Sequence, residues 1–447
     1  MIELLRRADP ARPAVVEDDR TTTYGELTEL AESVAAGMLE RDITRVASLD
    51  HDAATTIAVM AAAALAGVES CQYPPTDDPA EIDALTARFD HDLVICREPL
   101  QTIRASATTA LALRSAGSVP AEPPEARPLL VLTTGTTGTP RGVRQDWHRV
   151  LRGATRIKPA PDERWLLAYG LHQFAGLQIL VHVMAAGATL VSAVPRRPRE
   201  GLAAMRRHGV THASATPTYW RFLLAEMRTD GEAAPQLRQV TLGGEAIPGP
   251  LLGQLRDTFP MAHVSQVYAA SEFGSSGSMR DGRNGLSLDV LSRGDSADIA
   301  MKIVDGELWV RSRVGMLGYY GEPPVDPDAW RPTGDLVEIV DDRIIFRGRT
   351  SEIINVGGVK VHPLPIEERV GAVPGVDMAR VFGRPNAMTG SIVAIEIVAA
   401  PGSDTDALTT AIRTACADLP AAARPRSIRF VDTVSMAGNK IVRRDTE

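Results

Sequence analysis

The sequence is poor in the features that mark secreted and nucleic-acid-binding proteins. Its three cysteines, Cys71, Cys96 and Cys416, are an odd number and lack the spacing of a disulfide framework or a zinc site. Lys and Arg number 48 against 56 Asp and Glu, and this net charge of −8 argues against general nucleic-acid binding. These absences predict a reduced, cytoplasmic protein without a nucleic-acid partner.

Little in the sequence could enter a membrane. Residues 1–13 lack the apolar core of a signal peptide. Residues 166–195 contain no Asp, Glu, Lys or Arg, so a membrane span has to be considered there. The same stretch contains His172, His182 and three glycines, and we interpret it as a loop followed by a buried core helix. We therefore expect no membrane span.

Alternating strand and helix patterns run through most of the 447 residues, a length typical of two or three domains. Residues 14–42 read as strand, turn, strand edge and helix, with Thr23 as the helix N-cap, and a second, buried helix ends at Gly67. From about residue 291, short strands with turns such as Asp305-Gly306 replace this pattern. The fold class predicted is α/β, with helix-covered sheets, a β-rich subdomain and a small α+β part at the end of the chain.

The most unusual stretch is VLTTGTTGTPRGVRQDW, which begins at Val131. Five threonines and two glycines fill residues 133–139. Backbone N–H groups and Thr hydroxyls of such a loop can surround an anion, and Arg141 could pair with a phosphate oxygen. The pattern is not a Walker A motif, since no Gly-Lys-Ser/Thr follows at the required offset. On its own, a loop of this composition is more often a mobile surface turn.

Further segments accompany the loop in a characteristic order. They are TTTYGEL (21–27), LHQFAG (171–176), LGGEAIP (242–248), VYAASEFG (267–274), RPTGDL (331–336), FRGRTSEIINVGGVKVHP (346–363) and AGNKIVRRD (437–445). Together with the loop they resemble the adenylate-forming superfamily of acyl-CoA synthetases, peptide-synthetase adenylation domains and luciferases. The resemblance implies a large N-terminal ATP- and acid-binding domain, residues 1–349, and a small mobile C-terminal lid domain, residues 350–447, that pivots at Thr350-Ser351.

The resemblance also implies a site for ATP. The residues expected to hold its β- and γ-phosphates are Thr133, Thr134, Gly135, Thr136, Thr137, Gly138 and Arg141. Those expected beside the adenine, some of which would also line the acid pocket, are Gly243, Gly244, Glu245, Tyr268, Ala269 and Ala270. Asp335 would accept both ribose hydroxyls, and Arg347 and Arg349 would reach ribose or phosphate.

Four residues are expected to act on the reacting groups. Glu272 would bind Mg²⁺, which prefers oxygen ligands, and Ser271 would offer a hydroxyl to the α-phosphate. Lys440 would bridge the acid and the α-phosphate. His172 is either a gate of the acyl pocket or a buried histidine with a structural role. After rotation of the lid, Gly357 and its neighbour Gly358 would face a pantetheine arm.

Several positions depart from the pattern of the superfamily. Arg141 replaces the usual Lys, which keeps the charge but exchanges a compact ammonium for a planar fork. Ala175 and Ala269 stand where the pattern has Gly, and Ser271 stands for Thr and keeps the hydroxyl. Ser351 replaces the usual charged residue at the hinge.

The predicted function is an ATP-dependent ligase that forms an acyl-adenylate and pyrophosphate and then acylates CoA or a phosphopantetheine, with an acyl carrier protein as a candidate partner. One alternative is an adenylating enzyme with a non-thiol acceptor, such as an amine, or with a non-carboxylic acid. Another is a non-catalytic nucleotide-binding protein. The expected pocket segments contain no Lys or Arg, which favours a small or aromatic apolar acid.

Other motifs received plainer interpretations. His208 and His212 are four residues apart, but Gly209 and Val210 intervene at an expected helix end, so we reject a zinc site. We expect Trp220 in the core. The arginines between 141 and 158 suggest a solvated helix face or, alternatively, a contact for a nucleotide 3′-phosphate or an acidic carrier protein.

Overall fold

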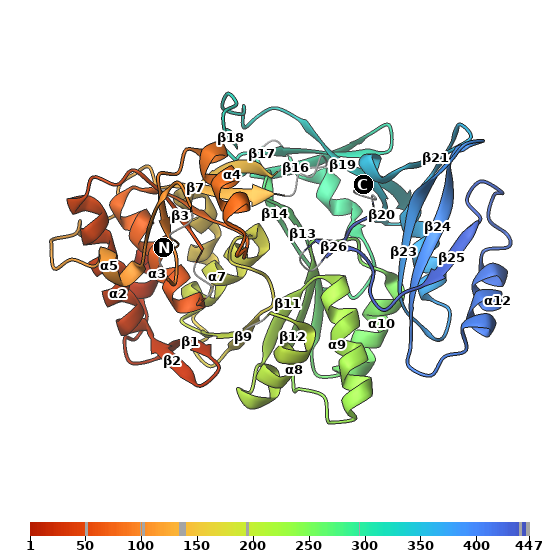
Figure 1. Ribbon diagram of the computed structural model, residues 1–447, viewed down its shortest axis with the longest axis horizontal. Helices are drawn as coiled ribbons and strands as arrows, with labels where there is room; N and C mark the ends of the chain where they lie inside the picture. Colours follow the sequence, from red (N-terminus) through yellow and green to blue (C-terminus); the bar gives the residue numbers. More distant parts are fainter. Residues whose placement is uncertain are drawn as a thin grey trace.

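The computed structural model of the chain describes residues 1–49, 52–98, 100, 103–133, 140–193, 196–294, 296–437 and 440–443. The N-terminal part, red to green in Figure 1, occupies the left and centre of the view, and the C-terminal sheet, in blue, lies at the right. The last described strands turn back toward the centre. The mixed α/β fold agrees with the class predicted from the sequence.

The largest sheet of the described chain has eight strands in the order β14-β13-β12-β11-β9-β10-β1-β2. Its strands are β14 (Gly274–Met279), β13 (His263–Ala270), β12 (Gln239–Gly243), β11 (His212–Ala215), β9 (Arg164–Leu167), β10 (Thr189–Ser192), β1 (Pro13–Glu17) and β2 (Arg20–Thr23). The six strands from β13 to β1 are parallel, and β14 and β2 are antiparallel edges. The carboxyl ends of the six parallel strands therefore meet at one edge of the sheet.

A second sheet has seven strands among the described residues, in the order β18-β8-β7-β4-β3-β5-β6. They are β18 (Gly318–Tyr319), β8 (Arg141–Asp146), β7 (Pro128–Thr133), β4 (Glu69–Gln72), β3 (Arg45–Ser48), β5 (Leu93–Ile95) and β6 (Ser106–Thr108). β7 and β8 form an antiparallel hairpin in which Thr133 lies opposite Arg141. The Thr- and Gly-rich stretch is thus the connection of a hairpin.

Helices pack on these sheets: α1 (Ile2–Arg7), α2 (Tyr24–Glu40), α3 (Ala53–Ala66), α4 (Pro79–Phe89), α5 (Ala110–Leu113), α6 (Trp147–Val150), α7 (Phe174–Ala186), α8 (Pro198–Arg207), α9 (Pro217–Asp230) and α10 (Gly249–Thr258). The predicted caps are confirmed. Thr23 forms a capping box with Glu26 at the start of α2, and Gly67 ends α3 in the left-handed conformation at φ +73°. Trp220 is fully buried on α9, as expected.

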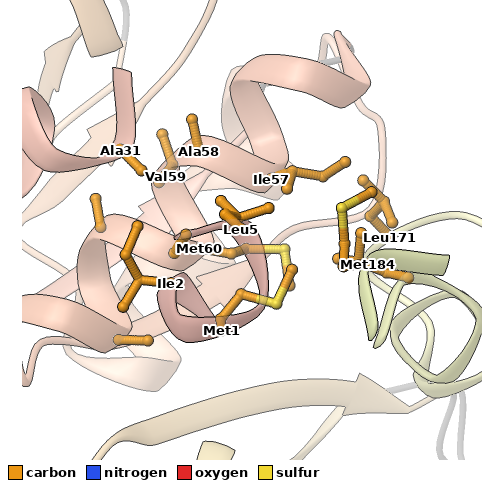
Figure 2. Close-up of a cluster of buried hydrophobic side chains, with 14 of the residues drawn as sticks. Met1, Ile2, Leu5, Ala31, Ile57, Ala58, Val59, Met60, Leu171 and Met184 are labelled. Carbon is orange, nitrogen blue, oxygen red and sulfur yellow. The ribbon is translucent and has the colours of Figure 1, made fainter. Parts of the chain in front are cut away.

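The first core joins the N-terminal helices to α7. Figure 2 shows Met1, Leu5 of α1 and Met60 of α3 facing Leu171, in the loop before α7, and Met184 of α7. Each of these five side chains is almost fully buried. The core therefore fixes the loop that starts at Leu171, and His172 is the next residue.

Two smaller sheets complete the described fold. The β-rich subdomain predicted after residue 291 is a sheet of β15 (Leu286–Ser287), β20 (Arg343–Arg349), β19 (Arg331–Val340), β17 (Glu307–Ser312) and β16 (Ile299–Val304). The C-terminal sheet contains β22 (Val359–Val361), β21 (Ile354–Val356), β24 (Gly390–Ala399), β23 (Val376–Asn386) and β25 (Ser427–Phe430), with helices α11 (Pro363–Gly371) and α12 (Thr405–Ala415). The short 3-10 helices are η1 (Leu151–Arg156), η2 (Leu288–Ser292) and η3 (Thr350–Glu352).

A last two-stranded unit, β26 (Met436–Ala437) and β27 (Lys440–Ile441), follows the C-terminal sheet. In Figure 1, β26 lies in the middle of the molecule near β13, whereas β24, β25 and α12 lie toward its right-hand side. The end of the described chain thus returns to the N-terminal part.

One prediction about helices is wrong. Residues 141–158 do not present one helical face, because 141–146 form β8 and only the short α6 and η1 follow. The pairing of β8 with β7 overrides the local helical pattern there.

Candidate active site

The predicted site segments follow the carboxyl ends of neighbouring parallel strands. His172 comes after β9, Glu245 after β12, and Ser271 and Glu272 after β13. Because these strand ends share one edge of the eight-stranded sheet, segments that are far apart in the sequence meet there. This edge is where open parallel sheets usually bind ligands.

Glu272 lies in a network of hydroxyl groups. Ser271 Oγ donates to Glu272 Oε2 over 3.0 Å, and the Tyr319 hydroxyl donates to Oε1 over 3.2 Å. Burial and the nearby Glu272 raise the pKa of Tyr319 to about 12. The carboxylate is thus an acceptor held by neutral donors, which suits an oxygen ligand for a cation.

Arg141 stands at the edge of the same network. Its guanidinium carbon lies 3.4 Å from the centroid of the Tyr319 ring, and its Nη2 donates to Glu322 Oε1 over 2.8 Å. A planar guanidinium can stack on a ring in this way, whereas an ammonium would make only a point contact. Thr133 Oγ1 donates weakly to the Arg141 carbonyl over 3.4 Å. The predicted loop residues Thr134, Gly135, Thr136, Thr137 and Gly138 lie outside the described residues.

Asp335 is held on both carboxylate oxygens. Its Oδ2 accepts from the Tyr268 hydroxyl over 2.6 Å and its Oδ1 from Arg349 Nε over 2.9 Å. The side chain is only 12% exposed, and Asp335 and Arg349 are register partners on β19 and β20. Each oxygen keeps a second lone pair, so the carboxylate could still accept two further hydrogen bonds.

The tyrosine beside Asp335 belongs to an aromatic cluster. The ring centroid of Tyr268 lies 5.2 Å from that of Phe273 and 4.9 Å from that of Phe346. Its neighbours on β13, Ala269 and Ala270, pair with β14. Burial and the adjacent Asp335 raise the pKa of Tyr268, so the hydroxyl remains a donor at neutral pH.

Arg347 points to a different partner. Its Nε donates to Glu338 Oε2 over 2.8 Å across the β19–β20 hairpin. The register of the two strands shifts at Arg347, because Leu336 pairs with Gly348 whereas Val337 pairs with Phe346. The predicted role of Arg347 near the nucleotide stays a prediction.

The Gly-Gly-Glu segment makes close contacts. The Gly243 carbonyl accepts from the Tyr169 hydroxyl over 3.1 Å, and Gly244 has φ +81°, a left-handed value that favours glycine. Glu245 accepts from the backbone and side chain of Thr218 at the start of α9, each over 3.0 Å. Glu245 also accepts from the backbone N–H of Ile441 over 3.0 Å.

This last bond brings the end of the chain to the sheet edge. Ile441 directly follows Lys440 on β27, so the backbone of Lys440 lies beside the Gly-Gly-Glu segment. Val442, next in the chain, is held from the other side, because its carbonyl accepts from Arg380 Nε over 2.6 Å. The structure therefore places the backbone of Lys440 beside the loop after β12, and Asp335 beside Tyr268 of β13, the strand that leads to Glu272.

His172 follows β9, an interior strand of the eight-stranded sheet. Its ring packs so closely on Gly170 that a Cβ there would lie 2.2 Å from the ring. Burial and the charge of Arg196 lower the pKa of His172 to about 4, so the imidazole is neutral at pH 7. The departure at Ala175 is accommodated, because the next residue, Gly176, makes the close approach: its Cβ would meet the Gly170 carbonyl at 2.2 Å.

Two arginines near the site were not predicted. Arg196 follows β10, is placed near His172, and has a buried Nε without a hydrogen-bond partner among the described residues. Arg331, at the start of β19, has a buried Nη1 that also lacks a hydrogen-bond partner among the described residues. Burial lowers the pKa of Arg331, and the nearby Tyr319 and Glu272 oppose this change. Arg331 is the first residue of the RPTGDL segment, so this motif could have identified it as a site residue.

The zinc interpretation stays rejected. His208 ends α8, whereas His212 on β11 stacks on Trp165 with centroids 4.8 Å apart. Within the described ranges, no group of three or more His, Cys, Asp or Glu side chains could hold a metal ion.

Across those ranges, too, no helix is long and apolar enough to cross a membrane. Cys71, Cys96 and Cys416 are buried free thiols.

Comparison with known proteins decides the family. A family model described as AMP-binding enzyme matches residues 5–320, more than half of the chain, and one described as AMP-binding enzyme C-terminal domain matches residues 365–440. The chain belongs to the AMP-binding enzyme family. The resemblance inferred from the motifs is thereby confirmed.

Curated relatives in this family carry the names of CoA ligases. A 3-[(3aS,4S,7aS)-7a-methyl-1,5-dioxo-octahydro-1H-inden-4-yl]propanoyl:CoA ligase of Mycobacterium tuberculosis is 27% identical over 344 residues, 74% of this chain and 67% of that protein. The 2-succinylbenzoate–CoA ligase of Bacillus subtilis is 24% identical over 427 residues, 87% of this chain and 86% of that protein. Other relatives, such as the enzyme of the latter name from Salmonella typhimurium, are matched over 53% of their length.

Solved structures share the fold over the whole chain. An o-succinylbenzoate CoA synthetase from Bacillus subtilis, in complex with its acyl-adenylate intermediate, has a TM-score of 0.80 at 20% identity and covers 100% of this chain and 98% of that one. The anthranilate CoA ligase AuaEII, in complex with anthranoyl-AMP, has a TM-score of 0.84 at 19% identity and covers 98% and 95%. At these identities the likeness establishes the fold of the AMP-binding enzymes for this chain.

Proposed function

We propose that the protein is an ATP-dependent acid ligase that forms an acyl-adenylate and pyrophosphate and then transfers the acyl group to a thiol. The observation that carries this proposal is the Ile441–Glu245 hydrogen bond, which holds the backbone of Lys440 at the sheet edge of Glu272. The names of the relatives, which are CoA ligases, support a thiol acceptor over an amine.

In the first half-reaction, an oxygen of the acid attacks the α-phosphorus of ATP, and the bond to pyrophosphate breaks. Negative charge builds around phosphorus, so the reaction needs positioned donors and cations more than a covalent nucleophile. Ser271 would donate its hydroxyl to the α-phosphate. Lys440 would bring its ammonium group to the acid and the same phosphate.

The residues present suit a magnesium ion shared with the nucleotide. Glu272 offers one carboxylate whose neighbours, Ser271 and Tyr319, are neutral hydroxyls. Mg²⁺ commonly takes one or two carboxylates from the protein and its other ligands from phosphate and water. When bound, the ion would neutralise charge on the phosphates.

The nucleotide would be held at the subdomain sheet. Asp335 would accept the two ribose hydroxyls with its free lone pairs, while Arg349 and Tyr268 keep its carboxylate in one orientation. Gly243 and Gly244 would let the adenine approach the backbone. The unpartnered Nη1 of Arg331 and the guanidinium of Arg141 are candidate contacts for phosphate oxygens.

The acid would bind near His172, whose neutral ring can act as a gate or as a packing surface. The expectation of an apolar acid rested on pocket segments without Lys or Arg. Arg196 comes from a further segment and adds a buried cation close to His172. We therefore favour an acid with an apolar or aromatic body that tolerates a polar group at this end.

The acceptor would reach the site after the lid, residues 350–447, rotates about Thr350-Ser351. Gly357 and Gly358 form the turn between β21 and β22, with φ of +57° and +86°, and present a surface without side chains. CoA is our first candidate. A phosphopantetheine on an acyl carrier protein is the second, since MmaC of Mycobacterium marinum, a relative 25% identical over 356 residues, is named a fatty acid–[acyl-carrier-protein] ligase. We place the reaction in the cytoplasm.

Exchange of labelled pyrophosphate into ATP over a panel of carboxylic acids tests the proposal. We expect exchange only with Mg²⁺ and with a subset of acids. CoA and a phosphopantetheinylated carrier protein, added separately, should then distinguish the two acceptors by thioester formation. Absence of exchange with every acid, despite measurable ATP binding, would contradict the first half-reaction.

A further inference from the structure

The end of the chain touches the N-terminal domain through one carboxylate. Glu245 Oε1 accepts from the Ile441 N–H over 3.0 Å, and the same side chain accepts from the N–H and the hydroxyl of Thr218 at the first turn of α9. Glu245 thus joins three elements: the loop after β12, the start of α9 and the strand that carries Lys440.

Arg443 fixes the other side of this contact. It donates to both carboxylate oxygens of Glu367 on α11 over 2.7–3.0 Å, and to Glu352 over 3.3 Å. Its side chain is 15% exposed and that of Glu367 is 6% exposed. Although burial acts against the charge, Glu367, Glu352 and Glu245 together raise the pKa of Arg443. Arg443 therefore ties the segment 440–443 to α11 and Glu352 of the lid.

A second arginine faces this group from the N-terminal domain. Arg221 projects from α9 toward the end of α11, where its Nη2 would lie 3.6 Å from a Cβ placed on Gly371. Burial lowers the pKa of Arg221, and the nearby carboxylates of Glu367 and Glu245 oppose this change. Arg221 lines the same small cavity as Glu245 and Glu367, so its guanidinium lies near carboxylates from both parts of the chain.

The space that remains between these residues is too small for a ligand. The cavity lined by Thr218, Arg221, Glu245, Glu367 and Arg443 has a volume of ≈ 20 Å³. This is about the space of one water molecule. The cluster is therefore a closed contact between domains and does not extend the nucleotide site.

We propose that Glu245, Arg221, Glu367 and Arg443 form an interdomain latch that positions Lys440 for adenylate formation and opens before thiol transfer. The inference rests on the proposed function. Glu245 binds the backbone of the residue after Lys440, so it acts through Ile441 and is a positioning residue. Because Lys440 is adjacent to a fixed N–H group, opening of the latch withdraws its backbone from the phosphate end of the site.

The charged character of the latch suits a contact that must be reversible. Taking charges out of water offsets much of the attraction between them, so buried ion clusters specify an arrangement without making it very stable. An apolar contact of equal area would resist opening, because it would expose apolar surface to water. The latch can therefore select one domain orientation and still release it in each turnover.

Separate measurement of the two half-reactions tests the latch. The variants are Glu245→Ala, Glu245→Gln and Arg221→Met, and Arg199→Met on the surface of α8 is the control, since its partner Glu226 belongs to the same domain. Adenylation is followed by pyrophosphate exchange. Transfer is followed in a single turnover from a synthetic acyl-adenylate to the thiol.

We expect Glu245→Ala and Arg221→Met to slow exchange by roughly tenfold to a hundredfold, the effect of losing a hydrogen bond or ion pair to a charged group. For Arg221→Met, transfer should stay within about threefold of the parent, or become faster, because the lid leaves the first orientation more easily. Glu245→Gln keeps an acceptor oxygen for Ile441 and should recover most of the exchange. Equal losses in both half-reactions, or unchanged exchange, would overturn the latch.

A distance measurement tests the latch without any acid. Met261 and Met388 are 84% and 93% exposed on the N-terminal domain and the lid, and all three native cysteines are buried, so Met261→Cys with Met388→Cys accepts a label pair selectively. Glu245→Ala should broaden or shift the distance distribution of the parent, and Arg199→Met should not. An unchanged distribution would overturn the latch, whereas absent pyrophosphate exchange in the parent would count against the proposed function alone.

Discussion

The nucleotide side of the site and the lid segment 440–443 are held by different kinds of structure. Asp335 lies on a long strand, is paired in register with Arg349, and is bonded on both oxygens. The lid segment pairs over two residues with β26, and within the described part of the chain its hydrogen bond to the N-terminal part is made to the carboxylate of Glu245. One side is built into a sheet, and the other is attached by side chains.

This difference indicates which part of the site can move during the reaction cycle. Sheet pairing and hydrogen bonds hold Asp335 without a ligand, so the proposed nucleotide side would be preorganised. The lid segment depends on a few charged contacts that water can replace. We infer that variants of the first kind weaken binding of ATP, and variants of the second kind change the balance between the two half-reactions.

The largest effect should come from the lid. We expect Lys440→Ala to slow acid-dependent pyrophosphate exchange by about 10²- to 10³-fold, since a charge that stabilises the transition state is lost. Transfer from a supplied acyl-adenylate should remain near the parent rate. If Lys440→Ala exchanged pyrophosphate as fast as the parent, the assignment of Lys440 would be wrong.

The buried His172 should affect how the free energy of unfolding depends on pH. The pKa of His172 is about 4 in the folded chain and about 6.5 when unfolded, so the unfolded state binds the proton first as the pH falls. The contribution of His172 to the free energy of unfolding should therefore be constant above pH 6.5. It should lower that free energy by up to about 3 kcal/mol as the pH falls from 6.5 to 4. Denaturant unfolding of the parent and of His172→Asn measures this.

A second histidine, His91, also contributes to the loss of stability at acid pH. Burial lowers the pKa of His91 to about 4 as well, and its Nδ1 shares a hydrogen bond with the Tyr73 hydroxyl over 2.8 Å. His172→Asn should therefore reduce the acid slope without removing it. An identical slope in parent and variant would contradict the buried, neutral state of His172.

The fixed side should respond through affinity. We expect Asp335→Ala to raise the KM for ATP by about 10- to 30-fold through loss of two charge-assisted hydrogen bonds, with a smaller change in kcat. Steady-state kinetics at saturating acid would show it. Tyr268→Phe, which removes one donor to Asp335, provides the matched weaker variant, and unchanged ATP dependence in Asp335→Ala would disprove ribose binding there.

The smallest effect should come from an exposed contact between the same two domains. Arg228 on α9 pairs with Asp377 on β23 over 2.5 Å, and the arginine side chain is 55% exposed. We expect Arg228→Met to change either half-reaction less than about twofold, because exposed ion pairs contribute little. A loss as large as that of Arg221→Met would mean that any interdomain contact matters equally.

Local signals in the sequence predicted the elements that local chemistry determines. Thr23 and Gly67 are read from capping rules, and both were confirmed. Helix α11 was not predicted, although Pro363 stands at its first turn. The helix expected within 141–158 failed because β8 needs β7 as a partner, and no short window contains both.

The site residues likewise fall into those that a short motif predicts and those that only long-range packing reveals. The motifs predict roles for Glu272, Asp335 and Lys440, because each carries its chemistry in a short segment. Neither Tyr319 beside Glu272 nor Arg221 beside Glu367 could be read in this way. Their partners are far away in the sequence, and only the packing of sheets and domains brings them together.

The most direct test of the adenylating function is to search for the adenylate itself. The parent, incubated with Mg·ATP and an acid that supports exchange but without a thiol, should retain acyl-adenylate in an amount close to that of the enzyme, detectable by mass spectrometry after acid quench. Lys440→Ala, treated in the same way, should retain at least about tenfold less. ATP consumption with no acyl-adenylate in the parent would contradict the proposed reaction.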